Sequence, residues 1–497
     1  MNELSLIARA RFHGEAVAIR APNGKHSYQE LLDRSAIVAG LLLEDDADLV
    51  EARVACLIPA GFDYVATQWG IWRAGGIFVP LSLSATVPEL EYTLTDSQVS
   101  CLVAACDQAE KVRELCERLG LRLLFAEEIT DEASPSKPLP EVAPDRRAMI
   151  LYTSGTTSRP KGVVTTHANI EAQIKSLVEA WEWQADDRIP LFLPMHHIHG
   201  IINVLSCAMW SGATIEPFAK FDLSPILDRV AAGAWSLFMA VPTIYVRLIQ
   251  TLEPMPEDKR EEIIAGFAGM RLMVSGSAAL PASVHETWQS LTGQRLLERY
   301  GMTEIGMGLS NLYRGERRPG AVGRPLPRVE IRLKSESGKL IEAEDQPGEI
   351  QVRGPGVFLE YWNRPDVTEN SFDDGWFRTG DVAVVESGYF RIMGRQSIDI
   401  IKSGGYKLSA LEIEAALLDH PAIRECAVVG LPDETWGEAV SAAVVLEAGS
   451  VLSLEALRKW SRDRLSSYRI PKRLLVVEQL PRNAMGKVTK PSVVELF

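Results

Sequence analysis

The chain has 497 residues, too many for one ordinary core, so we expect two or three subdomains. Hydrophobic residues make up 46% and charged residues 24%, a composition typical of soluble globular proteins. The formal net charge of −14 argues against nucleic acid and anionic membranes as partners.

Cysteine usage and the N-terminus bear on location. The six cysteines have no Cys-x-x-Cys spacing, which favours reduced thiols over disulfides or a metal site. Residues 1–12 lack the apolar core of a signal peptide, and no run of about 18 apolar residues is present. Arg9 and Arg11 on an amphipathic helix leave a short transit peptide open. We expect a cytoplasmic protein without stable membrane association.

The first 145 residues alternate between strand and helix patterns. Residues 16–20, 53–58 and 76–81 are predicted strands, and residues 27–42 and 63–72 are predicted helices. Ser27 with Glu30 three positions later forms a capping box. This alternation predicts parallel sheet with helices on its faces. Residues 130–145, rich in Pro, Ser and acidic residues, are expected to form an exposed connector.

An apolar run at 148–152 leads into Thr-Ser-Gly-Thr-Thr-Ser-Arg-Pro-Lys-Gly-Val at 153–163. We expect a strand, then a loop, then a helix. Gly155 and Gly162 allow positive φ, so backbone N–H groups can converge on an anion, and Arg159 and Lys161 add donors. The spacing is not that of a Walker A loop, because Pro160 precedes the lysine. A phosphate loop is one interpretation, and a solvated linker is the other.

The loop resembles the phosphate loop of the adenylate-forming superfamily of acyl-CoA synthetases, peptide-synthetase adenylation domains and luciferases. It departs from that pattern at Ser158, where Gly is usual. Further motifs agree in order, so the resemblance covers residues 10 to 492. It implies an α/β fold with a large N-terminal domain of sheets flanked by helices, predicted at 1–396. A small mobile α+β C-terminal domain is predicted at 397–497.

By this resemblance, ATP is held by the loop and by several later turns. The assigned nucleotide-binding residues are Thr153, Ser154, Gly155, Thr156, Thr157, Lys161, Ser275, Gly276, Ser277, Tyr300, Gly301, Met302, Asp381 and Arg395. Asp381 is assigned to the ribose, because a carboxylate accepts hydrogen bonds from both hydroxyls of a diol. Thr303 is assigned to the α-phosphate, and Glu304 with Thr156 to Mg²⁺, a hard cation that prefers oxygen ligands.

The resemblance also places function in the C-terminal part. Lys487, in Pro-Arg-Asn-Ala-Met-Gly-Lys at 481–487, matches the catalytic lysine. Gly404, Gly405 and Tyr406 match the loop beside the acyl group and the pantetheine of CoA. Ser397 stands at the hinge, where relatives often have Asp or Lys. Ser409 with Glu412 predicts the start of a helix.

The acyl group is assigned to His197, His199, Arg299 and Met302. Three histidines at 196–199 suggest metal, but no carboxylate or Cys stands at ligand spacing, which favours a pocket wall. Arg299 precedes Tyr300, and an arginine there can grip a second carboxylate with a bidentate fork. An ion pair with Glu298 or Glu304 is the structural alternative. The combination of residues 197–199, 274–280 and 298–304 resembles that of malonyl-CoA synthetases.

The sequence thus predicts a two-step ligase that uses ATP, Mg²⁺ and CoA, with a small dicarboxylic acid as substrate. Alternatives are a short-chain or aryl acyl-CoA synthetase and an adenylation enzyme that loads a separate carrier protein. A nucleotide sensor without catalysis is disfavoured, because both Lys487 and Glu304 are present. Malonate and methylmalonate are not distinguished.

Overall fold

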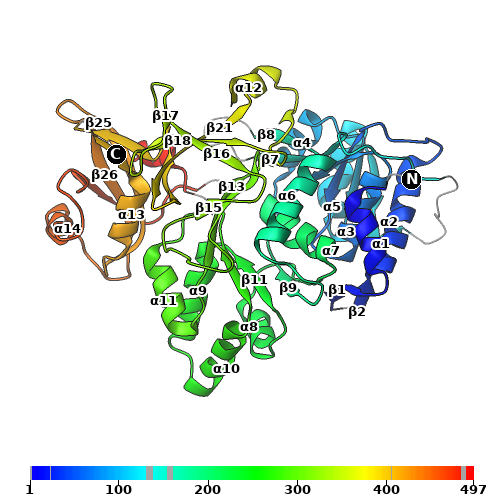
Figure 1. Cartoon of the computed structure of the whole chain (residues 1–497), viewed down its shortest axis with the longest axis horizontal. Coiled ribbons are helices and arrows are strands. Elements are labelled where there is room, and N and C mark those ends of the chain that lie inside the picture. Colours follow the sequence, from blue (N-terminus) through cyan, green and yellow to red (C-terminus); the bar gives the residue numbers. More distant parts are fainter. Residues whose placement is uncertain (1–2, 23, 130–137, 154–159, 405, 483–487) are drawn as a thin grey trace.

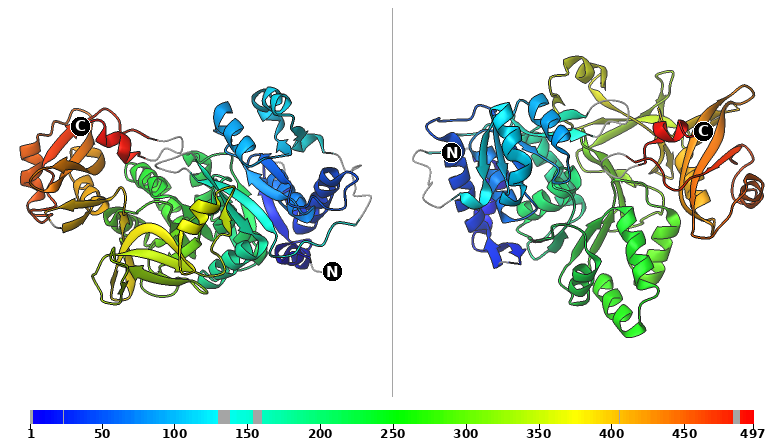
Figure 2. Two further views of the ribbon diagram at one scale, coloured as in Figure 1. Left: turned by 90° about the horizontal axis from the view of Figure 1, so that it is seen from above. Right: turned by 180° about the vertical axis from the view of Figure 1, so that it is seen from behind.

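The structure is a computed structural model that describes residues 3–22, 24–129, 138–153, 160–404, 406–482 and 488–497. The strands of these residues form five sheets. The N-terminal part, blue and cyan in Figure 1, and the C-terminal part, orange and red, lie at opposite ends of the molecule. The further views show the same separation (Figure 2). The predicted class, α/β with a large N-terminal and a small C-terminal part, is confirmed.

The largest sheet follows the predicted alternation. In spatial order its strands are β19 (Glu360–Tyr361), β8 (Lys161–Thr166), β7 (Arg147–Thr153), β4 (Ile77–Pro80), β3 (Arg53–Leu57), β5 (Cys101–Ala104) and β6 (Arg122–Phe125). The strands from β7 to β6 are parallel. The helices that precede or connect these strands are α2 (Tyr28–Leu43), α3 (Phe62–Arg73), α4 (Val87–Asp96) and α5 (Ala109–Leu119), with the short η1 (Cys106–Gln108) and η2 (Ala126–Glu128). The capping box of Ser27 and Glu30 is present at the start of α2.

Two more sheets complete the α/β region. One has the order β2 (Gly24–Ser27), β1 (Val17–Ala21), β10 (Thr214–Pro217), β9 (Arg188–Leu191). The other has the order β11 (Leu237–Ala240), β12 (Leu272–Ser275), β13 (Leu297–Met302), β14 (Gly306–Ser310), β15 (Arg324–Pro325). Their helices are α1 (Ser5–His13), α6 (His167–Ala180), α7 (Cys207–Ser211), α8 (Leu223–Ala231), α9 (Pro242–Leu252), α10 (Glu257–Ala268) and α11 (Ala282–Thr292). Buried Trp69, Trp72, Trp181 and Trp288 belong to the main core that joins these layers.

The segment around the predicted phosphate loop differs from expectation. The residues after it form strand β8, which pairs antiparallel with β7, and only then does α6 begin. The loop therefore joins two strands of a hairpin and does not lead directly into a helix. Gly162 lies inside β8 and does not have positive φ. Its lack of a side chain serves packing instead, because a Cβ there would lie 2.8 Å from Ile150 Cγ2.

The segment that begins at His199 has an uncommon helical form. Residues His199–Ser206 form a π-helix, η4, which continues into α7. π-Helical turns are rare and occur frequently at functional sites. Every residue of this π-helix is buried. The irregular backbone sets the direction of His199, one of the predicted acyl-site residues.

An antiparallel sheet lies between the α/β region and the C-terminal part. It contains β17 (Leu340–Ile341), β16 (Glu330–Lys334), β18 (Gly348–Arg353), β21 (Trp376–Glu386) and β20 (Phe372–Asp373), with β22 (Tyr389–Arg395) paired to β21. The helix α12 (Pro365–Asn370) precedes β20. The last strand of this sheet, β22, ends at Arg395, where the chain turns toward the final sheet.

The C-terminal sheet has its own hydrophobic core. Its strands are β24 (Tyr406–Ser409), β23 (Ile400–Ser403), β26 (Gly437–Leu446) and β25 (Ile423–Asp433), with β27 (Arg473–Val476) paired to β26. The helices are α13 (Ala410–Leu418), α14 (Leu454–Ser461) and α15 (Lys490–Val494). Ser409 caps α13 by accepting a hydrogen bond from the Glu412 backbone N–H. The division at residue 396 stays a prediction.

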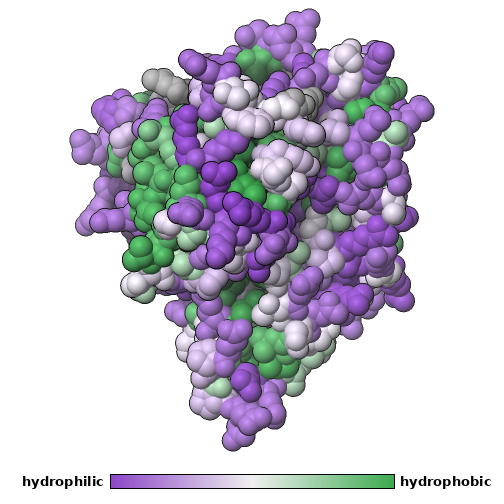
Figure 3. All heavy atoms as spheres, turned by 90° about the vertical axis from the view of Figure 1, so that its left-hand side faces the viewer, coloured by the Kyte–Doolittle hydropathy of each residue, from purple (hydrophilic) through white to green (hydrophobic). Residues whose placement is uncertain are grey.

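Hydrophilic side chains cover most of the face that the C-terminal part presents, and apolar ones gather in separate patches (Figure 3). Among the described residues, no helix combines the length and apolarity needed to cross a bilayer.

Candidate active site

Strand β13 sets the directions of three neighbouring site residues. Successive side chains of a strand point to opposite faces. Arg299 therefore points to one face, while Glu298 and Tyr300 point to the other. The turn after β13 carries Thr303 and Glu304, and the chain then returns as β14. One strand and one turn thus position most of the predicted catalytic and acyl-site residues.

Arg299 is a buried cation without a carboxylate partner. Only 4% of its surface is exposed, and no ion pair reaches it from the described residues. Its Nη2 donates to Ser277 Oγ at 3.5 Å, and its Nε has no hydrogen-bond partner in the described part of the chain. Burial lowers the pKa of Arg299 to about 9, which still leaves the guanidinium charged at neutral pH. A buried, unpaired charge is costly, so this arrangement favours an anionic ligand at this point.

The turn after β12 forms one wall around this guanidinium. A Cβ at Gly276 would lie 2.4 Å from Arg299 Cζ, so only glycine leaves room for the arginine there. The next residue, Ser277, has φ of 72°, an uncommon conformation for a residue other than glycine. The predicted turn at 275–277 therefore contacts Arg299 directly. Ser275 is buried at the end of β12.

His199 reaches the same serine from the π-helix. Its Nδ1 lies 3.1 Å from Ser277 Oγ, and its Nε2 has no partner among the described residues. Burial, followed by the nearby charge of Arg299, lowers the pKa of His199 well below 6.5. The ring is therefore neutral at pH 7, and His199 adds a polar contact without adding charge. His197 is half-buried and its ring lies 4.2 Å from that of His196.

The two carboxylates proposed as partners of Arg299 have other contacts. Glu298 accepts a hydrogen bond from the Gly320 backbone N–H at 3.1 Å. Burial raises the pKa of Glu298 to about 8, so its side chain is mainly protonated at neutral pH. Glu304 accepts a hydrogen bond from the Tyr361 hydroxyl at 2.8 Å. The alternative of an internal ion pair for Arg299 is therefore wrong.

Tyr300 joins a different set of contacts on the opposite face of β13. Its hydroxyl donates to Asp381 Oδ2 at 2.6 Å, and Arg395 Nε donates to Asp381 Oδ1 at 3.1 Å. Thr379 lies beside them, and its hydroxyl oxygen accepts a hydrogen bond from the Asp381 backbone N–H at 3.1 Å. The structure thus brings together Tyr300, Asp381 and Arg395, three residues assigned to the nucleoside. Their order is fixed by pairing between β21 and β22, in which Asp381 faces Arg395.

Glu304 and Lys161 meet at Tyr361. The Lys161 ammonium lies 4.3 Å from the centre of the Tyr361 ring, whose hydroxyl contacts Glu304. Glu304 is buried, and burial raises its pKa above the ordinary value. No group of three or more candidate metal ligands occurs among the described residues. One carboxylate that is completed by phosphate oxygens and water is nevertheless a usual Mg²⁺ arrangement, so this donor fits. Tyr361 itself was missed as a site residue, because no local sequence pattern connects it to Glu304.

The other described residues assigned to the nucleotide, on β13 and close to it, contact neighbouring parts of the chain. Gly301 has no space for a side chain, since a Cβ would lie 2.1 Å from the Gly306 carbonyl oxygen. Met302 packs against the apolar cluster that includes Leu309, Ile350 and Phe377. Thr303 is half-buried in the turn. Thr153 ends β7, and its hydroxyl contacts the Lys161 carbonyl at 3.5 Å.

Several predicted residues lie outside the described residues: Ser154, Gly155, Thr156, Thr157, Gly405 and Lys487. Gly404 and Tyr406 lie at the β23–β24 hairpin of the C-terminal sheet. There Gly404 faces Trp436, and the Tyr406 ring stacks on Tyr468 at 4.4 Å. Their recorded contacts are within the C-terminal part and not with β13.

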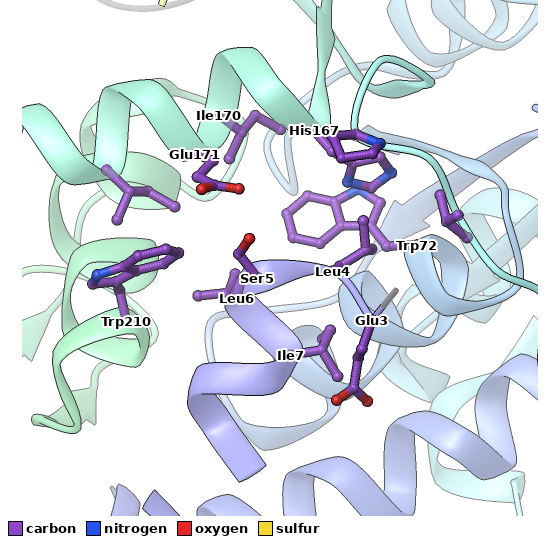
Figure 4. A pocket seen from close by; sticks show the side chains of 13 residues that line it. Glu3, Leu4, Ser5, Leu6, Ile7, Trp72, His167, Ile170, Glu171 and Trp210 are labelled. Carbon is purple, nitrogen blue, oxygen red and sulfur yellow. The ribbon is translucent and has the colours of Figure 1, made fainter. Parts of the chain in front are cut away.

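A separate cavity of about 330 Å³ lies among α1, α3, α6 and α7 (Figure 4). Ser5, Trp72, His167, Glu171 and Trp210 are among its lining residues. None of the predicted site residues lines it. The predicted site and this cavity are therefore distinct features.

Comparison with known proteins identifies two family matches. The family described as AMP-binding enzyme matches residues 6–362, and the AMP-binding enzyme C-terminal domain matches residues 412–487. A mitochondrial malonate–CoA ligase of Mus musculus is 42% identical over 528 aligned positions, which cover 99% of this chain and 91% of that protein.

Solved structures give a similar result. The crystal structure of ATP-bound MatB from Rhodopseudomonas palustris is 34% identical with a TM-score of 0.89, covering 100% of this chain and 99% of that one. The apo structure of the same protein, with the same identity and coverage, has a TM-score of 0.81. The structure of this chain is thus more similar to the ATP-bound structure of that relative than to its apo structure.

Proposed function

The chain belongs to the family of AMP-binding enzymes, and from this premise we propose that it joins malonate to CoA with the use of ATP, through a malonyl-adenylate. The observation that carries the choice of malonate is Arg299, a buried cation whose contacts leave its charge uncompensated. Relatives of 42% identity that are named malonate–CoA ligases support the same substrate.

The first step brings two anions together. An oxygen of one malonate carboxylate attacks the α-phosphorus of ATP, and the bond to pyrophosphate breaks. The obstacle is charge, so the enzyme contributes positioning and electrostatic stabilisation more than proton transfer. We assign the ribose to Asp381 and Arg395, the α-phosphate to Thr303 and the reacting oxygens to Lys487. Lys161 and the loop at 153–157 would hold the outer phosphates.

The metal site proposed here uses Glu304, with Thr156 as a second oxygen ligand. Mg²⁺ bound there would offset the negative charge of the phosphates. The Tyr361 hydroxyl holds the carboxylate of Glu304 in place from the side of β19. Lys161, over the same tyrosine ring, would keep the phosphates close to this carboxylate.

Arg299 would bind the carboxylate of malonate that does not react. A guanidinium and a carboxylate form two parallel hydrogen bonds, which fixes both position and orientation. His199, neutral and bonded to Ser277, would line the same end without attracting the reacting carboxylate. A monocarboxylic acid would leave Arg299 buried and unpaired, so it should be a poor substrate.

In the second step the thiolate of CoA attacks the acyl carbon, and AMP leaves. We place Gly404, Gly405 and Tyr406 beside the pantetheine during this step, by their match to the family. The C-terminal part would have to rotate between the two steps, with the turn around Ser397 as the hinge.

The test is turnover of a panel of acids with ATP, Mg²⁺ and CoA, measured as pyrophosphate release and as thioester formation. The panel contains malonate, methylmalonate, succinate, acetate, butyrate and benzoate. We expect malonate to have the highest kcat/KM and acetate to be at least about 100-fold lower, since a site built for a charged group rejects analogues that lack it. A preference for acetate, butyrate or benzoate would contradict the proposal, and pyrophosphate release without thioester would indicate a carrier protein as acceptor.

A further inference from the structure

The connection between β22 and β23 is a tight turn closed by Asp399. The backbone N–H groups of Ile398 and Asp399 donate to the Arg395 carbonyl at 3.1 and 2.8 Å. Asp399 Oδ2 in turn accepts from the Arg395 backbone N–H at 2.9 Å. Gly394 lies against the same side chain, since a Cβ there would be 2.4 Å from Asp399 Cβ. One carboxylate therefore fixes the conformation of the predicted hinge.

The other oxygen of this carboxylate binds a lysine from the end of the chain. Lys490 Nζ lies 2.5 Å from Asp399 Oδ1 and 2.7 Å from Glu414 Oε1. The side chains of all three are exposed by only 11–15%. Glu414 also accepts a hydrogen bond from the Val428 backbone N–H at 2.7 Å, within the C-terminal sheet. Lys490 thus links the hinge turn to the C-terminal core.

Lys490 follows directly after the base of the segment that carries Lys487. An isolated β-bridge joins Arg482 to Val488, and the Thr489 backbone N–H donates to the Pro481 carbonyl at 2.9 Å. Arg482 also pairs with Glu425 of β25 at 2.5 Å. The residues on both sides of 483–487 are therefore held to each other and, through Lys490, to the hinge. Lys487 itself lies outside the described residues.

The same turn borders the nucleoside contacts. Arg395, whose backbone is held by Asp399, uses its side chain to pair with Asp381. Asp381 also accepts the hydrogen bond from Tyr300. A continuous chain of contacts thus runs from Tyr300 through Asp381, Arg395 and Asp399 to Lys490. It joins the residues assigned to the nucleoside with the base of the lysine segment.

We propose that Asp399 and Lys490 are positioning residues for the adenylation step, because their ion pair holds residues 488–490, which follow directly after Lys487 in the sequence, to the hinge turn and the nucleoside contacts. The proposal rests on the proposed function for the identity of that step. Rotation about the hinge would separate Asp399 from Arg395, so the pair should matter less once the adenylate exists.

The test separates the two half-reactions in Asp399→Asn and Lys490→Gln. Adenylation is measured as acid-dependent exchange of pyrophosphate into ATP, and the second step as thioester formation from synthetic acyl-adenylate and CoA. We expect the first rate to fall about tenfold or more and the second to stay within about twofold, because misplacement of a catalytic group by 1 Å costs up to ~100-fold. The double variant should lose no more than either single one, since both remove the same contact.

Glu414→Gln is the matched control. It removes a charge from the same lysine at similar burial, but it leaves the contact of Lys490 with the hinge in place. It should lower Tm and leave the ratio of the two half-reaction rates unchanged. Equal losses in both half-reactions of Asp399→Asn, or a changed ratio in Glu414→Gln, would overturn the proposal. An unchanged exchange rate in Asp399→Asn and Lys490→Gln would overturn it as well.

The acid used is the one that the wild-type enzyme exchanges best. If that acid is not malonate, the proposed substrate fails while the positioning role is still tested. If the wild-type enzyme exchanges well and the variants do so equally, the positioning role alone fails.

Discussion

Arg299 and Tyr300 are adjacent on β13, yet their surroundings are opposite. Arg299 is a buried charge with one long hydrogen bond to Ser277 and an Nε without a partner in the described structure. Tyr300 donates a short hydrogen bond to Asp381, which is also paired with Arg395. The nucleoside side of the strand is thus satisfied before any ligand binds, and the acyl side is not.

The difference has a physical meaning for specificity. A site whose polar groups already bind one another gives a ligand a fixed frame at little cost of reorganisation. An unpaired buried charge destabilises the free protein and is compensated only by a ligand of opposite charge. The first arrangement suits ATP, the proposed nucleotide substrate, and the second selects the acid. Loss of the Arg299 charge and loss of the Asp381 charge should therefore change stability in opposite directions.

The largest expected effect is that of Arg299→Met. Its kcat/KM for malonate should fall by about 100-fold or more, because loss of one partner from a buried ion pair costs about 2–5 kcal/mol. Its Tm should rise, since an uncompensated buried charge is replaced by an apolar side chain. Steady-state kinetics and thermal unfolding check both. Arg271→Met is the control: that arginine is paired with Asp187, so its loss should lower Tm. A lower Tm in Arg299→Met would remove the contrast between the two faces.

A smaller effect is expected on the other face, in Asp381→Asn. The kcat/KM for ATP should fall by about tenfold, as charge-assisted hydrogen bonds are weakened, and the loss should be equal for every acid. Its Tm should fall because Arg395 loses its carboxylate partner. ATP titrations with malonate and with the next best acid check this. A loss that depends on the acid would show that the two faces are not independent.

His199→Phe should reduce kcat/KM for malonate by about fivefold, because one hydrogen bond to Ser277 is lost while the ring is kept. The pKa of His199 lies well below 6.5, so its ring stays neutral as the pH rises from 6 to 8. Wild type and variant should therefore have parallel pH profiles of kcat/KM over this range. A step near pH 6.5 in the wild type that the variant lacks would contradict a neutral histidine.

The smallest expected effect on activity is that of Glu298→Gln, which should change stability alone. Burial raises the folded pKa of Glu298 from 4.5 to about 8, so the unfolded chain releases this proton first as the pH rises. The contribution of Glu298 to stability is therefore present below about pH 4.5 and is lost up to about pH 8. A glutamine side chain does not titrate, so the variant keeps its stability as the pH rises. Its amide oxygen can still accept the hydrogen bond from the Gly320 backbone N–H. The variant should match the wild type in Tm at pH 5 and exceed it at pH 8, as measured by thermal unfolding. An equal difference at both pH values would refute the raised pKa.

The sequence predicted the fold class and the elements with strong periodicity. The capping box at Ser27 and the helix N-cap at Ser409 depend on local residue types, so the sequence could predict them. The order of β7, β8 and α6 was predicted wrongly, because a short strand after a polar loop has no periodic signal of its own. The π-helix that begins at His199 was also missed, because no sequence period distinguishes it from an α-helix. Its form depends on packing among buried elements.

The site was predicted unevenly. Tyr300, Asp381 and Arg395 were named from motifs, and the structure brings them together. That no carboxylate among the described residues pairs with Arg299 was not visible in the sequence, where Glu298 and Glu304 are close neighbours. The structure shows that these two carboxylates bind Gly320 and Tyr361 and not Arg299, because the side chains point in different directions. The link from Asp399 to Lys490 joins residues 91 positions apart, so no local pattern shows it.

The most direct test of the account is a crystal structure with a non-hydrolysable malonyl-adenylate analogue. The account predicts that the free carboxylate of the malonyl group lies within about 2.7–3.0 Å of the Arg299 guanidinium. It also predicts that the ribose lies at Asp381 and that the Tyr300 contact with Asp381 is retained. A malonyl carboxylate that points to solvent or to another cation, with Arg299 still unpaired, would contradict it.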